Sequence, residues 1–107
     1  MANQTVIGTF RVRAESEQAF RALLARHWPT LRTLGLVTEE ASQIYRSTES
    51  PPTYVEIFTW ADGGYEAAHE HPDVLAIWGP MESMVESRGG QIAWEFPHYE
   101  RLTLDEG

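Results

Sequence analysis

Alternating hydrophobic and polar positions predict a strand near the start of the chain. Within residues 6–13, Val6, Phe10 and Val12 point to one side, and polar side chains between them point to the other. This period of two is typical of a β-strand. Gly8 lies in the middle of the segment, where we expect either a bulge or close packing by a neighbour.

A helical spacing of apolar residues follows and predicts one helix over residues 16–34. The apolar positions recur every three or four residues, at Phe20, Leu23, Leu24, Trp28 and Leu31. Ser16 is expected to cap the start of this helix with its hydroxyl group. Pro29 is expected to kink the helix because proline lacks the backbone N–H that the helical hydrogen bond needs.

Three further strands are predicted at residues 43–48, 53–61 and 91–99. The segment 53–61 is the strongest, because it is rich in β-branched and aromatic residues and is apolar on both faces. We therefore expect both of its faces to be covered. In the last strand, Ile92, Trp94 and Phe96 are expected to share one face.

A broken helix is predicted between the third and fourth strands, over residues 63–87. Asp62 is expected to cap its first part. Pro72 and Pro80 each suit the first turn of a new helical piece, so we expect three short parts.

The order of these elements is β-α-β-β-α-β, which predicts an α+β, ferredoxin-like fold. Its four-stranded antiparallel sheet carries the helices on one face. Val55 and Ile57 point away from Tyr54, Phe58 and Trp60, so one apolar face is left after the helices cover the other. The sheet of a second copy in a two-fold homodimer is the simplest cover. The pattern leaves open which face meets the partner.

Composition and charge narrow the classes of function. The length of 107 residues predicts a single domain, residues 1–107, with its core within residues 5–100. The formal net charge of −8 is spread along the chain, so neither nucleic acid nor a membrane surface is an expected partner. Cysteine and lysine are both absent, which excludes thiolate, Cys-zinc and Schiff-base chemistry. The missing cysteines and the lack of a visible signal peptide favour a cytoplasmic location.

His69 and His71 are the sharpest chemical feature of the sequence. They flank the joint before Pro72, where a broken helix could aim an imidazole ring at a cavity, and histidine exchanges protons near neutral pH. On a helix the two rings diverge, whereas an extended segment would place them on one face. The alternative is that one histidine caps the segment before Pro72 and the other is solvated. A metal site with three convergent ligands, for example His69, His71 and Glu56, is a less favoured alternative, and we predict no metal site.

Glu56 stands among aromatic residues on one strand face. A buried carboxylate in such surroundings could act as a base. The interpretation that we favour is a structural carboxylate paired with an arginine of another strand, such as Arg11, Arg13 or Arg46, because buried charges are usually paired.

Aromatic side chains make up 11% of the chain and could line a pocket for a planar ring by offset stacking. The alternative is that they are core and dimer contacts. We predict Tyr54, Trp60 and Trp78 as the substrate-binding residues, since the two tryptophans flank the broken helix.

The chain resembles the dimeric α/β-barrel proteins of the antibiotic biosynthesis monooxygenase type. The resemblance rests on YVEIFTW at 54–60, AAHEHP at 67–72 and VLAIWGPM at 74–81, and extends over residues 5–100. It implies a homodimer with a small-molecule pocket in each subunit, between the helices and the sheet. The superfamily includes cofactor-independent quinol monooxygenases, haem-degrading monooxygenases, lactone isomerases and stress-responsive barrels, so the fold does not fix the reaction.

The haem-degrading branch can be compared residue by residue. Aligned on Asp73-Val74-Leu75, its motif tryptophan falls on His69 and its haem-ligating histidine falls on Gly79, which cannot ligate iron. We therefore expect no cofactor. The resemblance implies a monooxygenase-like enzyme for a small aromatic or quinol-type substrate, with His69 or His71 taking a proton from it. The alternative is a non-catalytic small-ligand-binding or stress-related dimer.

Overall fold

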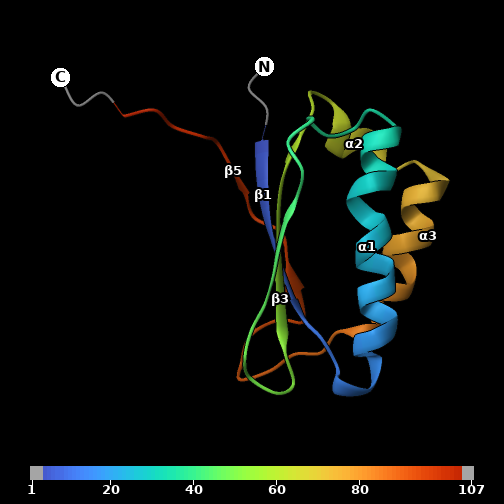
Figure 1. Ribbon diagram of the computed structural model, residues 1–107, viewed down its shortest axis with the longest axis vertical. Coiled ribbons are helices and arrows are strands. Elements are labelled where there is room, and N and C mark those ends of the chain that lie inside the picture. Colours follow the sequence, from blue (N-terminus) through green and yellow to red (C-terminus); the bar gives the residue numbers. More distant parts are fainter. Residues whose placement is uncertain (1–3, 105–107) are drawn as a thin grey trace.

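The computed structural model describes residues 4–104 and shows one antiparallel sheet with the helices packed on one side of it (Figure 1). The helices and strands, in chain order, are β1 (Gln4–Arg11), α1 (Glu17–Thr33), β2 (Gln43–Arg46), β3 (Thr53–Trp60), α2 (Gly64–Ala68), α3 (Pro72–Met81), β4 (Trp94–Glu95) and β5 (His98–Tyr99). Two short 3-10 turns, η1 (Ala14–Ser16) and η2 (Glu82–Met84), precede α1 and follow α3. The α+β, ferredoxin-like fold predicted from the sequence is confirmed.

The N-terminal strand β1 lies in the middle of the sheet. The strand order is β2-β3-β1, and both β4 and β5 pair with the other edge of β1. The ladder between β1 and β3 runs without a bulge from Gln4 opposite Trp60 to Arg11 opposite Thr53. A Cβ atom on Gly8 would lie 3.1 Å from a ring carbon of Phe96, so this glycine serves close packing.

The last predicted strand forms as two short strands, β4 and β5. Pro97 lies between them and cannot donate a backbone hydrogen bond, although its carbonyl accepts one from Ile7 N at 3.2 Å. Ile92 lies before β4 and is 60% exposed, so it does not share a buried face with Trp94. The prediction of one continuous strand over 91–99 was wrong.

Both long helices contain a proline. Pro29 lies within the single helix α1, as predicted, whereas Pro80 lies inside α3 and does not begin a new piece. Ser16 is at the N-cap position of α1, but its side chain makes no capping hydrogen bond. The N-cap of α2 is Gly63, in the left-handed region at φ 76°, and not Asp62. No helix within residues 4–104 has the length and apolar character needed to cross a membrane.

Two groups of buried apolar side chains fill the space between the helices and the sheet. One group consists of Phe10, Val12, Phe20, Leu24, Tyr54, Ile77, Met81 and Val85. The other consists of Val6, Leu31, Val37, Phe58, Trp60, Ala68 and Val74. The partly buried Trp78 packs against both groups.

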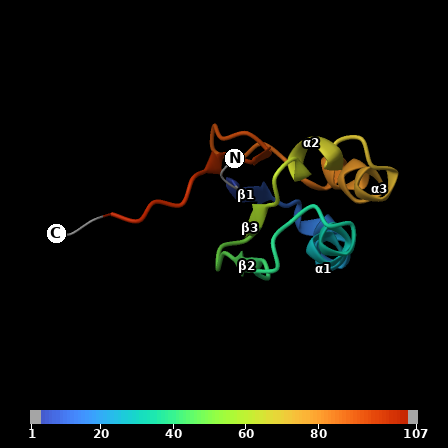
Figure 2. The ribbon, with the colours of Figure 1, turned by 90° about the horizontal axis from the view of Figure 1, so that it is seen from above.

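The two faces of β3 have different surroundings. Tyr54, Phe58 and Trp60 are buried beneath the helices, whereas Val55 and Ile57 are only half-buried on the opposite face. The view from above shows α1, α2 and α3 on the same side of β1 and β3 (Figure 2). The helices therefore cover one face, and within residues 4–104 no other element covers the second.

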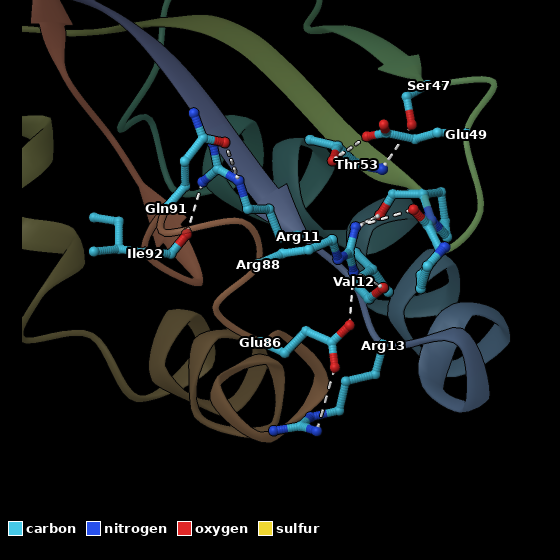
Figure 3. Close-up of polar contacts among 12 residues, drawn as sticks. Arg11, Val12, Arg13, Ser47, Glu49, Thr53, Glu86, Arg88, Gln91 and Ile92 are labelled. Carbon is cyan, nitrogen blue, oxygen red and sulfur yellow. Dashed lines mark hydrogen bonds and ion pairs between the residues drawn. The ribbon is translucent and has the colours of Figure 1, made fainter.

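Two arginines fasten the segment before β4 to the rest of the molecule (Figure 3). Arg11 donates to the side chain of Gln91 and, at 2.7 Å, to the carbonyl of Ile92. Arg88 donates to the carbonyl of Val12 at 2.8 Å and to two proline carbonyls in the turn before β3. These charge-assisted bonds fix the irregular chain that leads to the last two strands.

Candidate functional site

A pocket of about 440 Å³ lies between the sheet and the helices. Its lining comes from β1, β3 and the β4–β5 segment on one side, and from α1, α2, the α2–α3 joint, α3 and the start of η2 on the other. The volume falls within the range of about 300–1,000 Å³ that is common for small-molecule sites. The pocket is therefore large enough for an organic ligand.

Aromatic rings form a connected wall along one side of the pocket. Tyr65 packs edge-on against Trp60, His69 and His98, with ring centroids 5.8, 4.4 and 4.7 Å away. His69 packs in the same way against Trp78 at 4.9 Å. Because each ring supports the next, the wall presents ring faces and edges suited to a planar aromatic ligand.

His27 and Glu56 form a buried polar pair that also lines the pocket. Their side chains are 5% and 2% exposed, and His27 Nδ1 lies 2.8 Å from Glu56 Oε1. On the other side of the imidazole ring, Trp78 Nε1 donates to His27 Nε2 at 2.8 Å. The three side chains come from α1, β3 and α3, so their two hydrogen bonds join the sheet to both long helices.

The direction of these hydrogen bonds follows from the indole group, which can only donate. His27 Nε2 accepts from Trp78, so it carries no proton, and Nδ1 of the same ring must donate to Glu56. Glu56 Oε1 is thereby occupied. No hydrogen-bond partner is found among residues 4–104 for the other carboxylate oxygen, Oε2, although it is buried.

The predicted arginine partner of Glu56 was wrong. Arg11 pairs with Glu95 at 3.1 Å, Arg13 with Glu86 at 3.5 Å, and Arg46 with Glu17. All three arginines serve other carboxylates, and Glu56 is held by a neutral imidazole instead.

Several residues predicted for the site do line the pocket, namely Glu56, Trp60, His69 and Trp78. His69 lies at the mouth of the pocket, where its Nδ1 donates to the carbonyl of Tyr65 at 2.9 Å. A neutral ring bonded in this way keeps Nε2 as its free acceptor. Of these predicted residues, His69 is thus an exposed polar group of the pocket, and Glu56 is a buried one.

The structure places the other two predicted residues outside the pocket lining. His71 is the N-cap of α3, where its Nδ1 accepts from the backbone N–H of Asp73 at 3.1 Å. This is the capping role that the sequence offered as the alternative. Tyr54 lies in the core, and its hydroxyl group donates to Glu17 Oε2 at 2.6 Å.

The Tyr54 hydroxyl belongs to a surface cluster with Glu17 and Arg46. Hydrogen bonds from Arg46 and then from Tyr54 lower the pKa of Glu17 from 4.5 to about 2. Burial, followed by the bond to Glu17, raises the pKa of Tyr54. Tyr54 therefore stays protonated as a structural donor.

His27 is the site residue that the sequence analysis missed. The apolar positions assigned to α1 include 20, 24 and 31, and His27 falls on the same helical stripe. Phe20, Leu24, His27 and Leu31 are the buried residues of this helix. A histidine on a buried stripe is the signal that could have revealed it.

The pocket offers no cluster for a metal ion within the part of the chain that the structure describes. No group of three or more histidine, aspartate or glutamate side chains is placed there to hold one. His69, His71 and Glu56, the three ligands that a metal site at the histidine pair would need, do not converge.

Comparisons with known proteins bear on the fold. No family model matches the chain, and no curated protein matches it in sequence. Among solved structures, SnoaB, a cofactor-independent oxygenase from Streptomyces nogalater, is similar, with 18% identity, a TM-score of 0.73 and coverage of 99% of this chain and 100% of that one. A conserved protein from Methanosarcina mazei has 16% identity, a TM-score of 0.72 and coverage of 95% of both chains.

A third similar structure is a provisionally assigned antibiotic biosynthesis monooxygenase from Bordetella bronchiseptica. It has 18% identity and a TM-score of 0.59, over 96% of this chain and 100% of that one. The chain therefore has the antibiotic biosynthesis monooxygenase-like fold, as the sequence predicted. At these identities the likeness shows the fold alone.

Proposed function

We propose that this chain is a monooxygenase-like enzyme that acts, without a cofactor, on a small aromatic or quinol-type substrate. The observation that carries the proposal is a pocket of about 440 Å³ that combines aromatic walls with buried and exposed titratable side chains. Such a combination is the usual setting of a small-molecule active site. The likeness to SnoaB, described as a cofactor-independent oxygenase, supports the same proposal.

The proposed reaction begins when a pocket base takes the proton from a substrate hydroxyl group. The resulting anion is electron-rich and passes electrons to molecular oxygen. One oxygen atom is added to a ring carbon and the other leaves as water, so a quinol and O2 give a hydroxyquinone and H2O. The apolar lining keeps bulk water from the anion during this step.

The pocket residues divide between ring binding and proton transfer. We propose that Trp60 and Trp78 contact the substrate ring, and that the base is one of the two lining residues that the sequence singled out, the exposed His69 or the buried Glu56. His71 and Tyr54 are left out because their hydrogen bonds serve the helix cap and the surface cluster.

We also propose a homodimer formed through the uncovered sheet face. Ile7 pairs with Ile57 across the central ladder, and these residues, together with Val55, are half-buried on the face away from the helices. The sheet of a second copy would remove this apolar surface from water. A cytoplasmic location, favoured by the cysteine-free sequence, completes the proposal.

Filling the pocket tests the function directly. A Cβ atom on Gly79, which lines the pocket, meets no atom within 4 Å beyond its chain neighbours and its own helix backbone, so the leucine side chain of Gly79→Leu has room to extend into the pocket. We expect the wild type to consume oxygen with at least one member of a panel of quinols and polycyclic phenols. The rate of oxygen consumption by Gly79→Leu should be at least tenfold lower. Ala76→Leu, on the exposed surface of α3, is the matched control and should keep it.

Ligand binding measured beside oxygen consumption separates the two candidate functions. Binding of a phenol by the wild type with no oxygen consumption across the panel would favour the non-catalytic small-ligand-binding dimer. Equal oxygen consumption by the wild type and Gly79→Leu would contradict the assignment of this pocket as the site.

A further inference from the structure

We propose that Glu56, and not His69, takes the proton from the hydroxyl group of the ligand, and that His27 and Trp78 are positioning residues for its carboxylate. This proposal rests on the proposed function only in one respect, namely that oxidation of the ligand follows the proton transfer. The proton transfer itself requires a ligand and the pocket, but no oxygen.

The hydrogen-bond chain leaves one oxygen of Glu56 available for a ligand. Trp78 donates to His27 and His27 donates to Glu56 Oε1, each at 2.8 Å, so the chain has a single direction that ends at the carboxylate. His27 is also held in place by Phe58, whose ring packs edge-on at 5.7 Å. The carboxylate is thus fixed in orientation before a ligand enters, which is what a catalytic base needs.

The second oxygen, Oε2, is an acceptor without a donor within residues 4–104. Glu56 is 1% exposed, yet it lines the pocket, so a molecule in the pocket is what can reach it. Leaving a buried polar atom unpaired is costly. A ligand hydroxyl group would supply the missing hydrogen bond and, in the same contact, the proton.

The charges around the pocket indicate a neutral hydroxyaromatic ligand and not a carboxylate or sulfonate. Of the described residues that line the pocket, none is arginine, the chain has no lysine, and Glu82 adds a second carboxylate to the lining. An anionic ligand would therefore bring a further negative charge with neither arginine nor lysine among the described lining residues to pair it.

Proton transfer from a neutral hydroxyl group avoids this cost. The ligand O–H bond breaks, an O–H bond forms on Glu56 Oε2, and the electron pair stays on the ligand oxygen. The negative charge moves from the carboxylate to the ligand, so the pocket holds the same total charge before and after. No oxidation or reduction occurs in the step.

His69 is less suited to this role because of its position. It lies at the exposed mouth of the pocket, where water competes for its Nε2 and screens the charge that would develop. Its ring contacts with Tyr65 and Trp78 make it part of the aromatic wall. We assign His69 to ligand binding.

The test is a titration with alizarin, a hydroxyanthraquinone dye whose visible spectrum distinguishes its neutral and ionised forms. It is done without oxygen, at a pH at which the free dye is neutral. We expect the wild type and the matched control Glu70→Gln, which is outside the pocket lining, to bind the dye in its ionised form. Glu56→Gln should bind it neutral, because the amide keeps an acceptor for His27 but cannot take the proton.

The same titration compares the two candidate bases. His69→Ala should weaken dye binding while the bound dye remains ionised. Ionised dye bound to Glu56→Gln, or neutral dye bound to His69→Ala, would overturn the assignment of Glu56. Binding of 2-naphthoate as tight as that of 2-naphthol would overturn the assignment of a neutral ligand.

A measurement on the wild type covers the case in which Glu56→Gln fails to fold. With 13C-labelled glutamate, infrared difference spectra should show the carbonyl band of a protonated carboxyl group when the dye binds. Absence of this band would contradict proton transfer to a glutamate.

Trp78→Phe tests the positioning role, since it keeps a ring but removes the N–H donor to His27. The 15N spectrum of His27 should change from a single Nδ1–H tautomer to a mixture, and the ionised fraction of bound dye should fall several-fold. An unchanged tautomer and an unchanged ionised fraction would remove Trp78 from this role.

The two proposals fail in different ways. Ionised dye bound by the wild type with no oxygen consumption in any assay would end the proposed function and leave the role of Glu56 standing. Oxygen consumption that survives in Glu56→Gln would support the function and end the role of Glu56.

Discussion

At the scale of single residues, two glutamates show how surroundings divide the same side chain between different tasks. Glu17 lies at the surface, where Arg46 and Tyr54 both donate to its carboxylate. Glu56 is buried and accepts from one neutral imidazole, with its second oxygen unpaired within residues 4–104. The first is a saturated structural acceptor, whereas the second retains the capacity to bind and to take a proton.

The lowered pKa of Glu17 predicts a specific loss of stability in acid. Because the folded protein holds this proton less tightly than the unfolded chain, the carboxylate stabilises the fold fully above pH 4.5, and its contribution disappears as the pH falls to about 2. We expect the urea midpoint of the wild type to exceed that of Glu17→Gln at pH 6, and the two to converge toward pH 2.

The matched control for this prediction is Glu15→Gln, which removes a neighbouring exposed carboxylate from η1. The difference in urea midpoint between Glu15→Gln and the wild type should change little between pH 6 and pH 2. A difference between the wild type and Glu17→Gln that stays constant from pH 6 to pH 2 would contradict the role given to Arg46 and Tyr54.

Residue types and spacing revealed part of the site in advance. Trp60 and Trp78, which were predicted to bind the substrate, both line the pocket, and their role in binding stays a prediction. His27 was missed because a single histidine on an apolar stripe has the same pattern as a core residue. Its role depends on Glu56, 29 positions away in the sequence, and no local pattern contains that pairing.

At the scale of elements, the position of α2 depends on a close approach of two backbones. Gly63 turns the chain out of β3 with φ 76°, and Gly64 then begins α2 directly against the loop after α1. A Cβ atom on Gly64 would lie 2.0 Å from the carbonyl oxygen of Leu36. This contact brings Tyr65 and His69 to the mouth of the pocket.

The same substitution at two glycines should change the free energy of unfolding by different amounts. Gly64→Ala must displace the Leu36 backbone, and we expect it to lower the free energy of unfolding by about 1–3 kcal/mol. Gly79→Ala adds a methyl group that meets no atom beyond its chain neighbours and its own helix backbone. The gain in helix propensity is offset by Pro80, which disfavours a side chain on the helical residue before it, so the free energy of unfolding should change by less than about 1 kcal/mol. Thermal or urea unfolding of both variants checks the prediction, and a stabilised Gly64→Ala would contradict it.

Element boundaries followed from local rules where packing agreed with them. The alternating pattern located β1 and β3, and Pro72 marked the start of α3 as predicted. Pro80 was predicted to begin a new helical piece, but it lies inside α3. Ile77 and Met81 on either side of it are both buried, and their packing keeps the chain helical through the proline. Local propensity yields to tertiary contacts of this kind.

At the scale of the whole molecule, the sheet separates two environments. One face carries the helices, as Figure 1 shows, and the pocket. The other face carries half-buried apolar side chains, among them Val55 and Ile57. The sequence predicted this division but could not say which face of β3 meets the helices, because both are apolar. The shape of the pocket could not be predicted, because its lining residues are spread along the sequence from Val6 to His98.

The proposed dimer predicts that an arginine substitution should disrupt the dimer on the open face of the sheet but not on the helix side. Ile57 is on the open face, whereas Ile44 is opposite Glu56 and so projects toward the helix side of the edge strand. By light scattering at micromolar concentration, the wild type and Ile44→Arg should have twice the 12.2 kDa mass of one chain, and Ile57→Arg should be monomeric. A monomeric wild type would contradict the dimer.

The central place of β1 has a consequence for the order in which the protein can be assembled during synthesis. β1 leaves the ribosome before all of its partners, because it pairs on one edge with residues 53–60 and on the other with strands that begin only at Trp94. Its partners are thus made much later than the strand itself, and distant pairings of this kind are slow to form. Until Tyr99 has emerged, β1 exposes an unpaired edge of the kind that recruits other chains, so a nascent chain that stalls between β3 and β4 should be more prone to aggregate than a completed one.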